Sequence, residues 1–92
     1  MGDRLNLHRI DDPKAFAVIV GESVRRNRQA RGWTQVELAE TAGLSPNYIA
    51  RLERGEMGPS FFVAHHLGHT LGIDVSALLT TPQRTTRRRM AG

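Results

Sequence analysis

Residues Gln35 to Leu52 read QVELAETAGLSPNYIARL, and two helix-length segments in this stretch meet at Gly43. A glycine at that position can adopt the left-handed backbone conformation that a sharp turn needs. Ala39 is small, which lets the following helix cross close to it. The apolar residues expected to lock the two helices at a fixed angle are Leu38, Ile49 and Leu52. The spacing therefore predicts two short helices that a tight turn holds rigidly together.

Both helices carry a start signal. Thr34 and Glu37 form a capping box, in which the hydroxyl and the carboxylate satisfy each other's backbone N–H groups. Ser45 is a hydroxyl cap, and Pro46 after it lacks the N–H that a first helical turn would leave unpaired. We expect the first helix to run to about residue 42 and the second to about residue 54. The pair has the layout of a helix-turn-helix motif.

A long amphipathic helix is predicted before this pair. It should span about residues 13–31, with Asp12 as its N-cap and Pro13 at its first position. Its expected inner face carries Phe16, Val20, Val24 and Arg28. The glycines that follow helical patterns as C-terminal stops would are Gly32, Gly43, Gly55 and Gly72.

Two more helices are predicted after the pair. The fourth should start after Ser60, and its expected inner stripe is Phe61, Ala64, Leu67, Gly68 and Leu71. A short fifth helix follows Asp74 and should bury Leu78, with Leu79 as a second candidate for the core. Leu5 and Leu7 alternate as in a strand, although a frayed terminus is the interpretation that we favour. The predicted fold class is all-α, a compact five-helix bundle.

The net charge of +4 does not by itself identify a partner. Acidic and basic side chains balance in residues 1–14 and again in residues 15–79, so the whole excess lies in Arg84, Arg87, Arg88 and Arg89. The chain has no cysteine, which excludes disulfides and thiolate metal sites. We expect a soluble protein without a signal peptide or membrane span, because no apolar run is long enough for either.

Around the predicted pair of helices, the sequence resembles the lambda-repressor-like family of DNA-binding proteins, also called Cro/repressor or XRE-type. The resemblance spans about residues 20–79 and rests on RQARGWTQVELAETAGLSPNYIARLERGE, followed by LGI and a short helix. It implies a five-helix bundle of that type, whose third helix enters the DNA major groove. The implied organisation is a flexible arm over residues 1–12, a helix-turn-helix domain over 13–80 and a basic tail over 81–92.

By this resemblance, the residues that face base edges lie on the outward N-terminal part of the third helix: Pro46, Asn47, Tyr48 and Arg51. The chemistry agrees, because an arginine can donate two hydrogen bonds to guanine and an asparagine can pair with adenine. Arg51 is the strongest single candidate. The alternative for these residues is an ordinary solvated helix face.

Further positions match family residues that hold the DNA backbone or the fold. Gln35 matches a position that grips a phosphate, helped by free amides and the positive end of its helix. Thr34 and Arg54 are further candidates for phosphate contact. Arg28 and Glu53 match a pair that forms a structural salt bridge between the first and third helices.

Two features depart from a simple reading of the family. Asn27 stands where a leucine usually fills the core, so it either finds a hydrogen-bond partner or leaves that end loosely packed. His65 and His69 lie one helical turn apart, and His66 lies beside them. Because no carboxylate or cysteine is close in sequence, we expect no metal site and no cofactor.

An apolar strip is expected on the fourth helix, where Phe62 and Val63 replace polar or weakly apolar family residues. Together with Ile73, Val75 and the fifth helix it could form a two-fold dimer contact. Packing of Phe62 under the N-terminal segment is an equally simple explanation.

The sequence thus predicts a transcriptional regulator, a repressor or autoregulator, that binds double-stranded operator DNA as a homodimer. The operator should be a near-palindrome with half-sites roughly 34 Å apart, one helical turn of DNA. A cytoplasmic location, in a bacterial or phage setting at the nucleoid, is expected. A toxin or a polymerase subunit is a further possible partner.

Two alternatives stay open. One is an antitoxin or other protein-interaction module whose DNA contact is secondary. The other is RNA or nonspecific nucleic-acid binding led by the arginine tail. No enzyme is expected, since the residues offer no phosphate loop, nucleophile with a base, or paired carboxylates.

Overall fold

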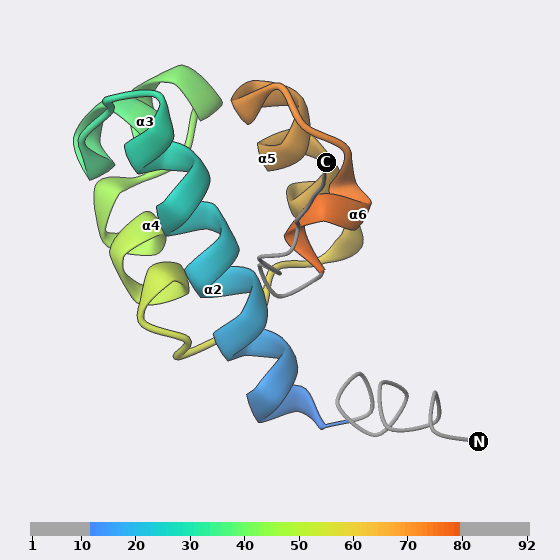
Figure 1. The fold of residues 1–92 in the computed structure, drawn as a ribbon. Coiled ribbons are helices and arrows are strands. Elements are labelled where there is room, and N and C mark those ends of the chain that lie inside the picture. Colours follow the sequence, from blue (N-terminus) through green and yellow to red (C-terminus); the bar gives the residue numbers. More distant parts are fainter. Residues whose placement is uncertain (1–11, 80–92) are drawn as a thin grey trace, which may run out of the picture.

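The computed structural model of the chain describes residues 12–79, which form five helices and no strand. The helices are α2 (Pro13–Ala30), α3 (Gln35–Ala42), α4 (Pro46–Glu53), α5 (Phe61–Leu71) and α6 (Val75–Leu78). The long helix α2 runs between the α3–α4 pair on one side and the α5–α6 pair on the other (Figure 1). The prediction of an all-α five-helix bundle is confirmed. The predicted arm with Leu5 and Leu7 and the basic tail with Arg84 and Arg87 to Arg89 lie outside the described residues.

Helix α2 begins and ends as the sequence predicts. The Asp12 carboxylate accepts a hydrogen bond of 3.0 Å from the Lys14 backbone N–H, and Pro13 occupies the first position. After the helix, Gly32 takes the left-handed conformation at a φ of 73°. Val20 and Val24 are fully buried on the inner face of α2. Helix α2 is therefore the central element, against which both helix pairs pack.

The described helices enclose one apolar core, and none of them is long and apolar enough to cross a membrane. Leu38, Ile49, Leu52, Leu67 and Leu78 supply its largest fully buried side chains besides the two valines of α2.

Two expectations for the inner faces were wrong. Phe61 is 74% exposed, because it begins α5, where its ring lies beside His65 with centroids 6.3 Å apart and not over the core. Leu79 is 41% exposed, since α6 ends at Leu78 and Leu78 alone fills the core position. The rest of the predicted stripe on α5 is buried: Ala64, Leu67, Gly68 and Leu71.

The contact between α2 and α4 is closest at Gly21. A Cβ atom there would clash with the backbone carbonyl oxygen of Leu52 and would lie 3.0 Å from that of Glu53. Both obstacles are backbone atoms, so a larger residue cannot be accommodated by turning a side chain. Gly21 thus sets the distance between the helix that organises the core and the second helix of the motif.

We predict that Gly21→Ala destabilises the fold. Alanine favours an isolated helix by up to about 1 kcal/mol over glycine, but overpacking costs about 1–3 kcal/mol, so the free energy of unfolding should fall. Urea denaturation followed by circular dichroism measures the change. The control is Arg26→Ala on the exposed side of the same helix, and an equal or more stable Gly21→Ala variant would contradict the close packing.

Candidate nucleic-acid interface

Helices α3 and α4 form the predicted motif with each local signal in place. Thr34 and Glu37 make both hydrogen bonds of the capping box, at 3.0 and 2.8 Å. Gly43 turns the chain at a φ of 73°, and the Leu44 N–H returns to the Ala39 carbonyl at 2.8 Å. The Ser45 hydroxyl accepts from the Tyr48 N–H at 3.0 Å and so starts α4. The start of α4 is therefore fixed by its own cap, directly after the turn that joins it to α3.

A buried ion pair joins α4 to α2. Arg28 donates from Nε and Nη2 to the two carboxylate oxygens of Glu53, at 2.7 and 2.9 Å. The side chains are only 11% and 3% exposed, and the Glu53 carboxylate raises the pKa of the Arg28 guanidinium. The remaining Nη1 donates to the Trp33 carbonyl at 2.7 Å. This is the salt bridge that the resemblance implies for the two residues.

Gln35 belongs to the same network. Its side-chain amide donates to the Glu53 carboxylate at 3.0 Å, which ties the first turn of α3 to the last turn of α4. The sequence offered this residue only as a phosphate contact. In the structure its amide nitrogen also has a partner inside the protein, while Thr34 lies exposed beside it.

Three of the four predicted base-reading residues lie on the exposed side of α4. Pro46, Asn47 and Arg51 are exposed, and Asn47 and Arg51 lie one helical turn apart. Within residues 12–79, the Asn47 amide makes no hydrogen bond. Tyr48 is half-buried and packs against the core, and its burial raises the pKa of the phenol.

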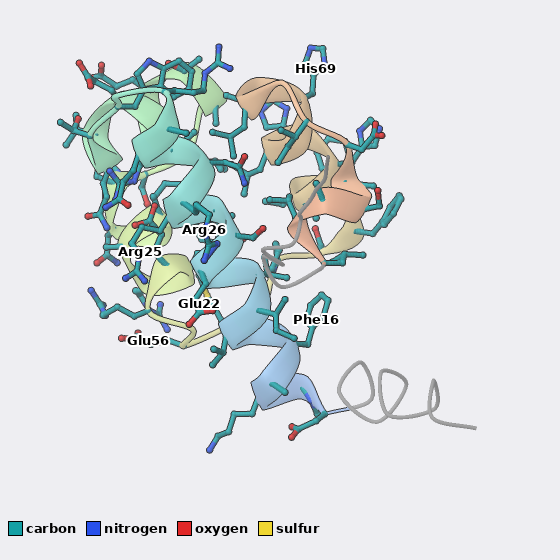
Figure 2. The ribbon with its side chains drawn as sticks, in the orientation of Figure 1. Phe16, Glu22, Arg25, Arg26, Glu56 and His69 are labelled. Atoms are coloured by element: carbon teal, nitrogen blue, oxygen red, sulfur yellow. The ribbon has the colours of Figure 1, made fainter. Side chains whose placement is uncertain are left out.

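Sequence reasoning missed Glu56, which binds two of the predicted site residues. Its carboxylate lies 3.2 Å from Nε of Arg51 and 2.6 Å from Nε of Arg54. Both arginines lower the pKa of Glu56, with Arg54 the stronger cause. Glu56 follows Arg54 by two residues and Arg51 by five, and neither spacing places side chains together on one face of a helix. The left-handed turn at Gly55 (φ 75°) brings the carboxylate back to α4. Figure 2 places Glu56 after the end of α4, on the side of the N-terminal part of α2.

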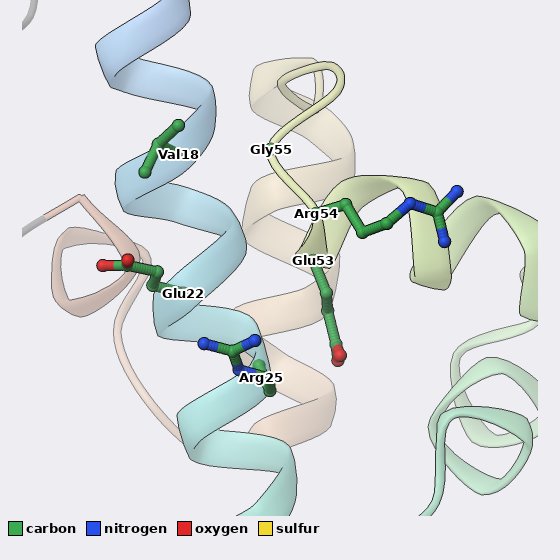
Figure 3. Close-up of a pocket in the computed structure, with 6 residues that line it drawn as sticks. All are labelled: Val18, Glu22, Arg25, Glu53, Arg54 and Gly55. Atoms are coloured by element: carbon green, nitrogen blue, oxygen red, sulfur yellow. The ribbon is translucent and has the colours of Figure 1, made fainter.

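A shallow hollow continues this surface between α2 and the end of α4. It is lined by Val18, Glu22, Arg25, Glu53, Arg54 and Gly55. In Figure 3, Arg25 and Arg54 extend on either side of Glu53. The lining holds two acidic and two basic side chains, so the charges of the hollow balance.

One open question from the sequence has a structural answer. Asn27 donates to the Ser23 carbonyl at 2.8 Å, so it has a hydrogen-bond partner. His66 lies with Nε2 2.7 Å from the Ala42 carbonyl oxygen and so joins α5 to α3. Among residues 12–79, no three potential metal ligands of the types His, Cys, Asp and Glu come together.

The predicted apolar strip on α5 is partly exposed. Phe62 is 77% exposed and follows Phe61, which is 74% exposed. Val63, Ile73 and Val75 are instead half-buried and pack against the core. Of the predicted strip only Phe62 is thus exposed, and Phe61 and Leu79 are the other large apolar side chains exposed on the described part of α5 and α6.

With this geometry in place, comparisons with known proteins agree on a family. Residues 24–78 match the family model HTH_3, described as helix-turn-helix. The immunity repressor protein of Bacillus phage phi105 is 42% identical over 60 residues, which cover 65% of this chain and 42% of that protein. The chain thus spans less than half of that repressor's length.

Solved structures share the fold. The hypothetical transcription factor NHTF from Neisseria matches with a TM-score of 0.70 and 28% identity, over 74% of this chain and 78% of that one. The restriction-modification controller protein C.AhdI from Aeromonas hydrophila matches with a TM-score of 0.64 and 32% identity, over 67% and 94%.

We predict that Glu53→Gln strongly destabilises the protein. The variant leaves the buried Arg28 guanidinium without its counter-charge, which costs on the order of 3 kcal/mol in the free energy of unfolding. Urea denaturation measures the loss. Glu40→Gln is the matched control, because Glu40 is exposed on α3 and should change stability by less than about 0.5 kcal/mol. Equal stabilities of the two variants would refute the structural role of the pair.

Proposed function

The chain belongs to the helix-turn-helix family HTH_3, and we propose that it is a DNA-binding transcriptional regulator that reads its operator through α4. The observation that carries this proposal is the exposed face of α4, where Asn47 and Arg51 lie on a helix held by the Ser45 cap and a buried ion pair. A rigid helix places side chains reproducibly in a major groove, which base recognition requires.

Arg51 and Asn47 are the proposed base-reading residues, with Pro46 and Tyr48 beside them. Arg51 uses Nε toward Glu56, and within residues 12–79 its two terminal nitrogens have no hydrogen-bond partner. A pair of free terminal nitrogens suits the O6 and N7 acceptors of guanine. The Asn47 amide is free in the same range and suits adenine N6 and N7.

The DNA backbone is the proposed partner of Thr34, Gln35 and Arg54. The exposed first turn of α3 offers backbone N–H groups and the positive end of a helix, which favour a phosphate. Because the Gln35 amide nitrogen is bound to Glu53, a phosphate contact by Gln35 competes with or extends that hydrogen bond. Such contacts orient a protein on DNA without reading its sequence.

A second copy of the chain is the proposed occupant of the exposed Phe61 and Phe62. Two adjacent phenylalanines at 74% and 77% exposure are costly in water, and a two-fold contact would cover them. A dimer would present two α4 helices and read a near-palindromic operator with half-sites roughly 34 Å apart. We further propose that the protein acts as a repressor or autoregulator in the cytoplasm, at the nucleoid.

We predict that Arg51→Ala weakens operator binding by about fivefold to 150-fold, the equivalent of roughly 1–3 kcal/mol for a bidentate base contact. Asn47→Ala should have an effect of the same kind at another base position. The operator is first selected from random duplexes, and fluorescence anisotropy then measures affinity. Arg26→Ala, an exposed arginine outside the proposed interface, is the control. Unchanged affinities of both α4 variants would contradict the role of α4.

We predict that Phe62→Glu converts a dimer into a monomer without unfolding it, because the side chain is exposed in the single chain. Sedimentation equilibrium measures the mass with and without operator DNA. Val36→Glu, an exposed apolar residue on α3, is the control and should stay dimeric. A wild-type protein that is monomeric both free and on DNA would remove the dimer, and the two phenylalanines would then point to a different protein partner, as in an antitoxin.

A further inference from the structure

Glu56 lies where the proposed DNA surface needs positive charge. Its two carboxylate oxygens each accept a hydrogen bond from one arginine, Oε1 from Arg51 at 3.2 Å and Oε2 from Arg54 at 2.6 Å. The Glu56 backbone N–H donates to the Arg51 carbonyl at 3.1 Å, which fixes the turn that carries the carboxylate. One carboxylate therefore binds two arginine side chains of the proposed site.

The atoms used in these bonds leave a defined part of each guanidinium free. Both arginines donate from Nε, and within residues 12–79 none of their terminal nitrogens has a partner. A guanidinium held by Nε has fewer orientations, so its terminal nitrogens are presented in a narrower range of directions. Such preorganisation favours a bidentate contact that needs one geometry, as on guanine, over contacts that accept many geometries.

The negative charge of Glu56 also favours base contacts over phosphate contacts. The three side chains are 42–57% exposed, so the carboxylate faces the same solvent that DNA phosphates would enter. A carboxylate there repels phosphates and competes with them for both arginines. Sequence-independent binding depends on neutralised phosphates and loses most from such competition, whereas base contacts are retained.

We propose that Glu56 is a specificity-determining residue of the α4 surface, which positions Arg51 for a base contact and weakens attachment of Arg51 and Arg54 to the DNA backbone. This inference rests on the proposed function of α4. Glu56 acts through the arginines and contacts no base itself.

The test compares Glu56→Gln with the wild type on the selected operator and on a scrambled duplex of equal length. We expect the variant to bind the scrambled duplex about fivefold more tightly, the size of an exposed charge contact. The magnitude of its salt slope on that duplex should rise by about one counterion. Operator affinity should stay the same or fall, so the ratio of operator to scrambled affinity should drop by about fivefold or more.

Asp74→Asn is the matched control, because it removes the same charge from the N-cap of α6, where the side chain makes no capping hydrogen bond. It should leave the ratio unchanged. Thermal unfolding of Glu56→Gln should match the wild type, since the residue is exposed. A Glu56→Gln variant that tightens both duplexes equally, or that changes no more than Asp74→Asn, would overturn the inference while α4 recognition stands. A wild type with no preference for any duplex would overturn the proposed function as well.

Discussion

The buried ion pair between Arg28 and Glu53 is the interaction on which the rest of the motif depends. It spans the gap between α2 and α4, and the same carboxylate also receives the Gln35 amide from α3. Replacing such a pair by apolar groups of similar volume often leaves stability unchanged, so its value is one of geometry. Its bidentate bonds allow one angle between the helices, whereas apolar packing alone tolerates several.

The close approach at Gly21 and the ion pair constrain α4 from the same side. Gly21 lets the end of α4 come within reach of α2, and Arg28, two turns further along α2, then binds Glu53 at that end. The opposite side of α4 is left to solvent and carries Asn47 and Arg51. The contacts on the buried side of α4 therefore fix the position of the surface proposed to read bases.

Sequence alone could predict the features that depend on residues close together in the chain. The capping box at Thr34, the cap at Ser45 and the left-handed glycines are local signals, and they are confirmed in the structure. The family resemblance is confirmed by the match over residues 24–78. Phe61 was misplaced because helical periodicity does not tell how far the core extends at a helix end. Glu56 was missed because its contacts depend on the path of the turn at Gly55, which no periodic pattern describes.

The balance of charge in residues 15–79 gains a meaning from these contacts. Arg28 is neutralised by a buried glutamate, and Arg51 and Arg54 share an exposed one. A domain with unpaired cations on its DNA face would adhere to any duplex, because phosphate attraction is independent of sequence. Under the proposed function, pairing the cations removes part of that attraction and leaves the terminal nitrogens of Arg51 for hydrogen bonds that differ between bases. In a regulator that must find one site among many, a neutral domain is thus a means of discrimination, and strong charge would work against it.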